Sequence, residues 1–266
     1  MIVPHVLTGV LDDLGPSWRF VLEIPIDGSV VIKRECFFSP EDKHEHPWRR
    51  LTAELATAFE RMEKEPLPGT EGGPLVSAQA VMIRADLNAP FESSLKIMEL
   101  CAEQRIRHIQ FAVGDARKVE RKLGLQPSTT WEQRLELTLP LDLTPPVDRT
   151  GPGPVEVSIR VLEAGRKLEM KRDEDLVWKE KQGTRFRLDL STRKVEYTIG
   201  ARQILGFSAF CARLQGMHGT LKGRPLVIDV GEGVTTAEAL LVLDAGRNLG
   251  VGGVTFVTSE TENKKR

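Results

Sequence analysis

The chain has 266 residues, enough for one large domain or two modest ones, because about 100 residues already bury a workable core. Hydrophobic residues make up 40% and charged residues 28%, as in globular proteins, and no apolar run reaches the roughly 18 residues that a membrane helix needs. Its 37 Lys and Arg residues balance 38 Asp and Glu residues, so the net charge of −1 predicts no nucleic-acid partner, and the three cysteines predict no disulfide framework.

The first predicted elements are a β-hairpin and a helix. Phe20–Ile26 and Ser29–Lys33 flank an Asp-Gly dipeptide, which is typical of hairpin turns. We interpret the charged segment Arg34–His46 as a loop that leads into an amphipathic helix, with Pro47 suited to the start of that helix. The apolar face of this helix comprises Trp48, Leu51, Leu55, Phe59 and Met62.

A strand–helix–strand unit follows the hairpin and the helix. Val81–Ala85 is a short apolar run typical of a buried strand, Pro90 favours a helix start, and Ile109–Val113 is a second strand. Residues 114–154 are predicted to be a linker, because they end in a segment rich in Pro and Gly. Within residues 155–180, Val155–Leu162 and Lys167–Lys171 are predicted to form an extra hairpin that belongs to neither repeat.

The second half of the chain shows the same order of elements. Phe186–Leu190 and Lys194–Ile199 are predicted to form a hairpin, and a helix with an apolar face follows. After the strand Leu226–Val230, a helix begins with Thr235 and Glu238 at the spacing of a capping box, and Val254–Thr258 forms the last strand. The apolar face of the first of these helices comprises Phe207, Phe210, Cys211, Leu214 and Met217.

An internal repeat relates the two halves. Residues 81–111 align without a gap with residues 226–256 at a constant offset of 145, so that Ile83 matches Ile228 and the apolar positions agree almost throughout. We therefore predict an α+β fold with two tandem small modules, each a mixed sheet with two helices on one face. The predicted divisions are a first module at 1–113, a linker with the extra hairpin at 114–183, a second module at 184–259 and a disordered tail at 260–266.

The first module resembles the periplasmic domains of the ExbD/TolR family of biopolymer-transport proteins. The resemblance is carried by Val81-Met-Ile-Arg-Ala-Asp86, by Pro90 and by Ile106-Arg-His-Ile-Gln-Phe111, and the preceding hairpin and helix stand in the family's order. It covers residues 18–113 well and residues 184–258 more loosely. In the second copy, Asp229 and Gly231 stand where the first copy has Arg84 and Asp86.

This resemblance implies a non-enzymatic binding or scaffolding role. Family members belong to an inner-membrane complex that couples the proton-motive force to envelope transport, so the implied partners are envelope proteins, including an ExbB/TolQ-like membrane partner, or peptidoglycan. Members often pair, which implies either a homodimer or an intrachain pseudo-dimer. The family's membrane helix with its proton-carrying Asp has no counterpart in this sequence, so none of the family's functional residues is carried over.

The location of the protein stays open between two expectations. It is the periplasmic face of the bacterial inner membrane if an upstream anchor is missing from this chain, and otherwise the cytoplasm. In the cytoplasm, the same fold would serve as a repurposed protein-interaction module. An enzyme whose catalytic residues are not apparent is the third alternative.

Arg84 and Asp86 are the candidate partner-contact residues, because they lie on one face of a predicted strand. A local ion pair or a helix cap is the alternative role for them. His44-Glu45-His46 could bind zinc, but the spacing favours a solvated loop. Cys101 and Cys211 are interpreted as buried structural thiols, and Gly231-Glu232-Gly233 is only a two-glycine match to a phosphate loop. No catalytic residue, metal ligand or cofactor is therefore predicted.

Overall fold

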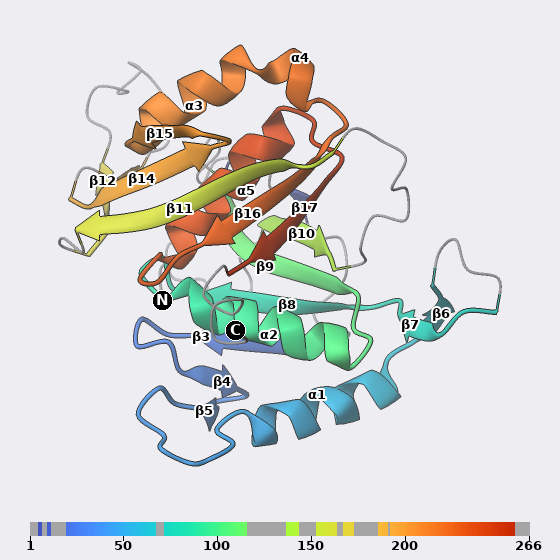
Figure 1. Ribbon diagram of the computed structural model, residues 1–266. Helices are drawn as coiled ribbons and strands as arrows, with labels where there is room; N and C mark the ends of the chain where they lie inside the picture. The colour runs from blue at the N-terminus through green and yellow to red at the C-terminus, as the bar shows by residue number, and fades with distance from the viewer. Residues whose placement is uncertain are drawn as a thin grey trace, which may run out of the picture.

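The computed structural model describes residues 5–6, 10–11, 20–67, 72–115, 137–143, 153–163, 167–172, 186–190 and 192–258. These residues form an α+β fold with two mixed sheets, as the sequence predicts (Figure 1). Much of the predicted linker and the predicted tail 260–266 lie outside the described residues.

The first sheet has the strand order β2-β10-β9-β8-β3-β4-β5, and β1 pairs with β9 beside this path. Its centre is parallel, since β8 pairs in parallel with both β3 and β9, while β4, β5 and β10 are antiparallel to their neighbours. The strands are β1 His5–Val6, β2 Val10–Leu11, β3 Phe20–Ile24, β4 Val30–Ile32, β5 Glu35–Phe38, β8 Ala80–Ala85, β9 His108–Asp115 and β10 Leu137–Asp142.

The second sheet has the order β15-β14-β11-β16-β17 and repeats the pattern of the first. Here β16 pairs in parallel with β11 and β17, and β14 and β15 continue the sheet antiparallel. The strands are β11 Val155–Glu163, β14 Lys194–Ile199, β15 Arg202–Leu205, β16 Pro225–Val230 and β17 Gly253–Val257. Two further ladders join β6 Lys64–Pro66 to β7 Leu75–Ser77 and β12 Glu169–Arg172 to β13 Phe186–Asp189.

Helices α2 and α5 lie between the two sheets, whereas α1 and α3 lie at the lower and upper ends of the molecule in Figure 1. In Figure 1, α2 lies in front of β3 and β8, whereas α5 lies behind β11 and β16. Helix α1 contacts α2, α2 contacts α5 and α5 contacts α3, so these helices form one row. The helices are α1 Arg49–Arg61, α2 Phe91–Glu103, α3 Phe207–Gly216, α4 His218–Leu221 and α5 Thr236–Asn248.

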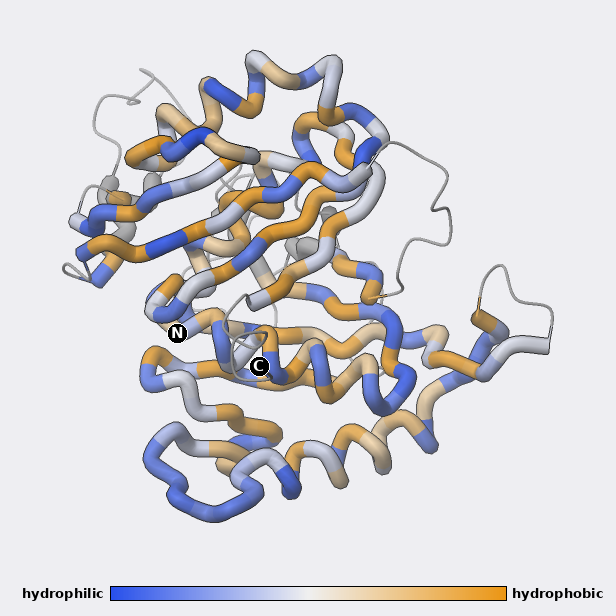
Figure 2. Tube along the Cα trace, viewed as in Figure 1, coloured by the Kyte–Doolittle hydropathy of each residue, from blue (hydrophilic) through white to orange (hydrophobic). Residues whose placement is uncertain are grey.

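The predicted apolar faces explain this packing. On α1, Leu51 and Leu55 are fully buried, and on α3 Phe210 and Leu214 are buried. Helix α5 is buried around most of its circumference, as expected of a helix that has apolar neighbours on both sides. Figure 2 shows the resulting contrast between the apolar strands and helices of the centre and the hydrophilic connection from β5 to α1.

The strand–helix–strand correspondence at the offset of 145 is confirmed in secondary structure. Strand β8 matches β16 and helix α2 matches α5 residue for residue, and β9 and β17 begin at matching positions. The predicted helix starts are also confirmed, since Pro90 and Thr235 are the N-caps and Thr235 forms the capping box with Glu238.

The strand pairing predicted upstream of the second repeat is wrong. Strand β14 pairs with β11 rather than with β13, and β13 pairs with β12 in a separate ladder. The extra hairpin of Val155–Leu162 with Lys167–Lys171 is therefore wrong too, because β11 is the central strand of the second sheet. Strand β10 likewise falls inside the segment that was predicted to be a linker.

The two halves meet where α2 and α5 begin. Pro90 and Thr235 face each other in an antiparallel β-bridge. The N–H of Phe91 donates to the carbonyl of Val234 (2.9 Å), and the N–H of Thr236 donates to that of Ala89 (2.8 Å). Among the described residues, no helix is long and apolar enough to cross a membrane.

Candidate functional site

The two residues proposed as partner contacts make local contacts within the first sheet. The Nη1 atom of Arg84 lies 3.8 Å from Oε1 of Glu23, on the neighbouring strand β3. The Oδ1 atom of Asp86 accepts a hydrogen bond from the N–H of Asn88 (3.0 Å), which shapes the turn before α2. These contacts agree with the alternative roles of ion pair and local turn, and a partner contact stays a prediction.

The second sheet has an ion pair of reversed polarity at the equivalent position. Asp229, the counterpart of Arg84, pairs with Arg160 of β11. The guanidinium of Arg160 also donates to the carbonyls of Ile159 (2.9 Å) and Asp229 (3.1 Å). In both sheets the charged residue of β8 or β16 thus pairs with a residue of opposite charge on the adjacent parallel strand, β3 or β11. The signs of the two charges are exchanged between the sheets.

The histidine cluster gathers no metal-binding set within the described parts of the chain. Nε2 of His44 lies 3.5 Å from Oδ1 of Asp42, and 85% of the His44 side chain is exposed. Among the described residues, no group of three or more His, Cys, Asp or Glu side chains could hold a metal ion. Residues 44–46 are exposed to solvent, in agreement with the prediction of a solvated loop.

Of the two helix cysteines that the sequence predicts to be buried, Cys101 is buried and Cys211 is only half-buried. Burial raises the pKa of the Cys101 thiol far above its usual range. Burial, together with the nearby Asp244 carboxylate, raises the pKa of Cys211 to about 11. Because the thiolate is the nucleophile, both side chains are held in their unreactive form at neutral pH.

The segment Gly231–Gly233 is occupied by contacts within the chain. The N–H of Gly233 donates to Oε1 of Glu92 (3.0 Å) at the start of α2, and the carbonyl of Gly233 accepts from Arg193 (2.7 Å). A Cβ atom at Gly231 would lie 2.7 Å from the Arg160 side chain, so glycine is required there for close packing. Gly233 has a φ of +71°, a left-handed backbone conformation that favours glycine. Both glycines are thus explained by the fold, without a phosphate ligand.

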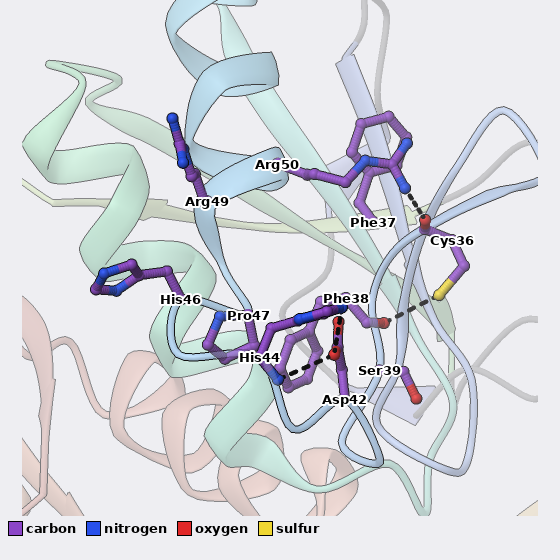
Figure 3. A pocket seen from close by; sticks show the side chains of 10 residues that line it. All are labelled: Cys36, Phe37, Phe38, Ser39, Asp42, His44, His46, Pro47, Arg49 and Arg50. Atoms are coloured by element: carbon purple, nitrogen blue, oxygen red, sulfur yellow. Dashed lines mark hydrogen bonds and ion pairs between the residues drawn. The ribbon is translucent and has the colours of Figure 1, made fainter.

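A cavity of about 360 Å³ lies where strand β5 meets the start of helix α1 (Figure 3). Strand β5 is the last strand on this side of the first sheet among the described residues, and its residues Cys36, Phe37 and Phe38 line the cavity. We refer to this cavity as the β5 groove. It is lined by Cys36, Phe37, Phe38, Ser39, Asp42, His44, His46, Pro47, Arg49 and Arg50.

Aromatic side chains form the apolar part of the β5 groove. The ring of Phe38 stacks on Trp48 with 3.6 Å between ring centroids and 13° between the planes. The guanidinium of Arg50 lies over the ring of Phe37, 4.8 Å from its centroid. These contacts fix aromatic surface beside an exposed strand.

Arg50 lies along the edge of β5. Its Nη1 atom donates to the carbonyl of Cys36 (3.0 Å), and its Nη2 atom pairs with Glu35. The thiol of Cys36 donates to the carbonyl of Phe38 (3.2 Å). Two main-chain carbonyls of the edge strand are thus bonded to side chains, as Figure 3 shows.

The rim of the β5 groove carries charged side chains of both signs. Arg49 and His46 are exposed and extend away from the centre of the groove in Figure 3. The first turn of α1 has no acidic residue and no side-chain cap, but Asp42 lines the groove and Glu41 and Glu45 are exposed in the connection that leads to the helix. The groove therefore combines aromatic side chains with charges of both signs.

A second cavity, of about 570 Å³, lies against the second sheet beside α2. Its carboxylates include Asp229, which pairs with Arg160, and Glu99, which pairs with Lys96 at 2.8 Å. The residues that line it are Leu95, Glu99, Glu156, Val157, Ser158, Thr198, Gly200, Val227, Asp229, Phe256, Val257 and Thr258.

Reasoning from the sequence missed the β5 groove, because the charged segment Arg34–His46 was interpreted as a loop. Glu35–Phe38 of that segment is a strand. The available signal was the pair Phe37-Phe38, which is apolar within a charged stretch and lies near Trp48 in the sequence.

Comparison with known proteins gives no relative: no protein-family model, curated protein or solved structure matches this chain.

Proposed function

We propose that this chain is a non-enzymatic binding or scaffolding protein, built from two ExbD/TolR-like modules that pair within one chain. The observation that carries the proposal is the reciprocal junction between the halves. Residues 89, 90 and 91 bond with residues 234, 235 and 236, which are their own counterparts at the offset of 145. Such reciprocity is the property of a two-fold interface, in which residue i contacts j and j contacts i.

The strand order supports two related modules. In the first sheet, β5-β4-β3-β8-β9 has the same sequence of parallel and antiparallel pairings as β15-β14-β11-β16-β17 in the second. Strand β11 supplies the counterpart of β3, since Phe20 pairs with Val81 and Val155 pairs with Leu226, the equivalent of Val81. The second module of the proposal therefore begins with β11 rather than at residue 184.

The core of the junction supports a permanent pairing. Phe91 is fully buried, and its ring packs against Phe111 of the first half and Phe256 of the second, with centroids 6.3 Å and 4.8 Å away. Phe111 and Phe256 are counterparts in the repeat. The pairing that single-module relatives reach by dimerisation would thus be built into one chain.

The proposed setting is the bacterial envelope, on the periplasmic side of the inner membrane, with an ExbB/TolQ-like protein, other envelope proteins or peptidoglycan as partners. This part rests on the resemblance of Val81–Asp86, Pro90 and Ile106–Phe111 to the family. A protein-interaction module of the cytoplasm is the second candidate, and the two differ in where the gene product is found.

The test is fractionation of cells that express the full native gene, with the mass of the product determined. The envelope proposal predicts a product in the inner-membrane fraction that is heavier than the 29.7 kDa of this chain, because members of the family that it resembles carry a membrane anchor. It also predicts that deletion of the gene impairs envelope integrity or energised uptake. A cytosolic product of 29.7 kDa would contradict the envelope role and favour the cytoplasmic interaction module.

A further inference from the structure

We infer that the second cavity, between α2 and the second sheet, binds an extended apolar segment of a partner protein that also carries a Lys or Arg side chain. The inference rests on the proposed binding function and names the surface and the chemistry of the partner. It does not depend on the compartment in which the protein works.

The first argument is that the internal repeat creates two equivalent sites. The second cavity lies between helix α2 of the first half and the sheet of the second half. The equivalent site lies between α5 and the first sheet, because the offset of 145 exchanges α2 with α5 and β8 with β16. Helix α5 does reach the first sheet, where Arg247 donates to the carbonyl of Pro140.

Burial of the counterpart residues shows that the equivalent site of the first half is filled. Met82 of β8 is fully buried, whereas its counterpart Val227 of β16 is only half-buried and lines the second cavity. Ala112 of β9 is also buried, whereas its counterpart Val257 of β17 is 38% exposed. The second half therefore leaves open a site that the first half covers.

The first strand of the chain lies at the filled site. Strand β1 contacts α5 and pairs in parallel with Gly114 and Asp115 of β9. These two residues directly follow residues 112 and 113, which are the counterparts of Val257 and Thr258 in the lining of the second cavity. Since an extended segment lies at the filled site, we expect an extended segment at the open one.

The second argument is the apolar surface of the open site. Leu95 of α2, Val227 of β16 and both Phe256 and Val257 of β17 line the second cavity. Its volume of about 570 Å³ lies within the range of ligand sites, which is roughly 300–1,000 Å³. Because the removal of apolar surface from water favours association, this lining selects apolar side chains of the partner.

Strand β17 adds main-chain groups to this surface. Within the described residues it pairs only with β16, whereas its counterpart β9 is also paired with the antiparallel strand β10. Such an edge presents N–H and C=O groups to which an extended peptide can bond, and β17 contains no proline. In the described part of the second half, neither β1 nor β10 has a counterpart at this edge.

The third argument is charge, because three carboxylates line the second cavity and no Lys or Arg does. Asp229 is paired with Arg160. Glu99 is paired with Lys96. Glu156 is exposed and has no ion pair with any residue that the structure describes. One uncompensated negative charge thus remains at the site, and charge complementarity selects a Lys or Arg of the partner.

The experiment is a selection of random peptides displayed on phage against the full chain, followed by binding measurements on three variants. Glu156→Lys reverses the uncompensated charge, and Val257→Trp fills the cavity; both residues are exposed, so neither change disturbs the core. Glu232→Lys is the control, because Glu232 is exposed after the end of β16, away from the residue of that strand that Glu156 faces.

We expect enriched peptides that combine apolar residues with Lys or Arg. They should bind Glu156→Lys and Val257→Trp at least about fivefold more weakly than the wild type, and bind Glu232→Lys normally. Methyl NMR of the complex then locates the peptide. The signals of Val227 and Val257 should shift, and that of Met82, at the filled site, should not.

Failure to enrich any peptide, enrichment of acidic peptides, or equal binding to all three variants would overturn the inference. Binding that requires removal of residues 259–266 would also overturn it, because the occupant would then be a segment of this chain. Methyl shifts at another surface would overturn the inference while leaving the proposed binding function in place. The envelope setting is tested separately, by fractionation, so the two can fail independently.

Discussion

Glu238 is a carboxylate in an almost fully buried position, with 1% of its side chain exposed. Oε2 accepts from the N–H (2.9 Å) and the hydroxyl (3.1 Å) of Thr235, and Oε1 accepts from Nε of Arg193 (2.8 Å). Arg193 also donates to the carbonyl of Gly233. Glu238 thereby joins the start of α5 to Arg193, before β14, and Arg193 in turn contacts the turn after β16.

We expect Glu238→Ala to lower the free energy of unfolding by about 3–5 kcal/mol, because it leaves Arg193 buried without its partner. Urea unfolding followed by circular dichroism measures this change. The matched control is Glu163→Ala, which breaks a pair with Lys194 whose side chains are 69% and 52% exposed. The Glu163→Ala control should lower the free energy of unfolding by no more than about 1 kcal/mol. Equal losses in the two variants would contradict the argument.

At the scale of elements, the contact of α2 with the second sheet depends on Phe91, the first residue of the helix. Phe91→Ala should lower the free energy of unfolding by about 3–5 kcal/mol, since a cavity opens between Phe111 and Phe256. Thermal or urea unfolding checks this. Phe207→Ala, which truncates a half-buried ring on α3, should lower the free energy of unfolding clearly less. A larger loss in Phe207→Ala than in Phe91→Ala would show that Phe91 does not hold the junction.

The elements that the sequence predicts well are those whose signals are local. The capping box at Thr235 and Glu238, the proline at 90 and the apolar face around Leu51 and Leu55 are set within one or two turns of helix, and the structure has each of them. These local signals also place both strand–helix–strand units correctly.

Strand pairing was harder to predict, because it joins residues far apart in the chain. The prediction paired Lys194–Ile199 with its nearest upstream strand, as hairpins usually do. The structure instead pairs it with β11, and β12 and β13 form a ladder of their own in between. The sequence predicts that the candidate residues Arg84 and Asp86 share a strand, but β8 ends at Ala85 and Asp86 lies in the turn that follows. The sequence also could not show that Glu23 lies beside Arg84.

At the scale of the whole molecule, most of the described buried apolar residues of both halves belong to one core, beside a small separate cluster of Leu87, Leu168 and Ala237. The core contains Leu22 and Leu55 of the first half and Tyr197 and Phe210 of the second. Arg247 of α5 reinforces this union by donating to the carbonyl of Pro140 in β10 (2.8 Å). Two sheets thus share a single interior.

A shared core predicts one cooperative unfolding transition rather than two. Amide hydrogen exchange in increasing urea should give the same midpoint for peptides from α1 and from α3. A transition of the first half at a urea concentration where the second half stays protected would contradict this, and would mean that the junction only tethers two independent domains.

The bridge between Pro90 and Thr235 has a consequence for how the sequence can change over evolutionary time. In a symmetric homodimer, a residue on the two-fold axis faces its own copy, so every mutation there occurs twice and a charge meets an identical charge. In this chain the two sides of the junction are separate codons. Pro90 can therefore fix the entry into one helix while Thr235 caps the other, and Ser93 can bind the carbonyl of Gly28 while its counterpart Glu238 holds Arg193.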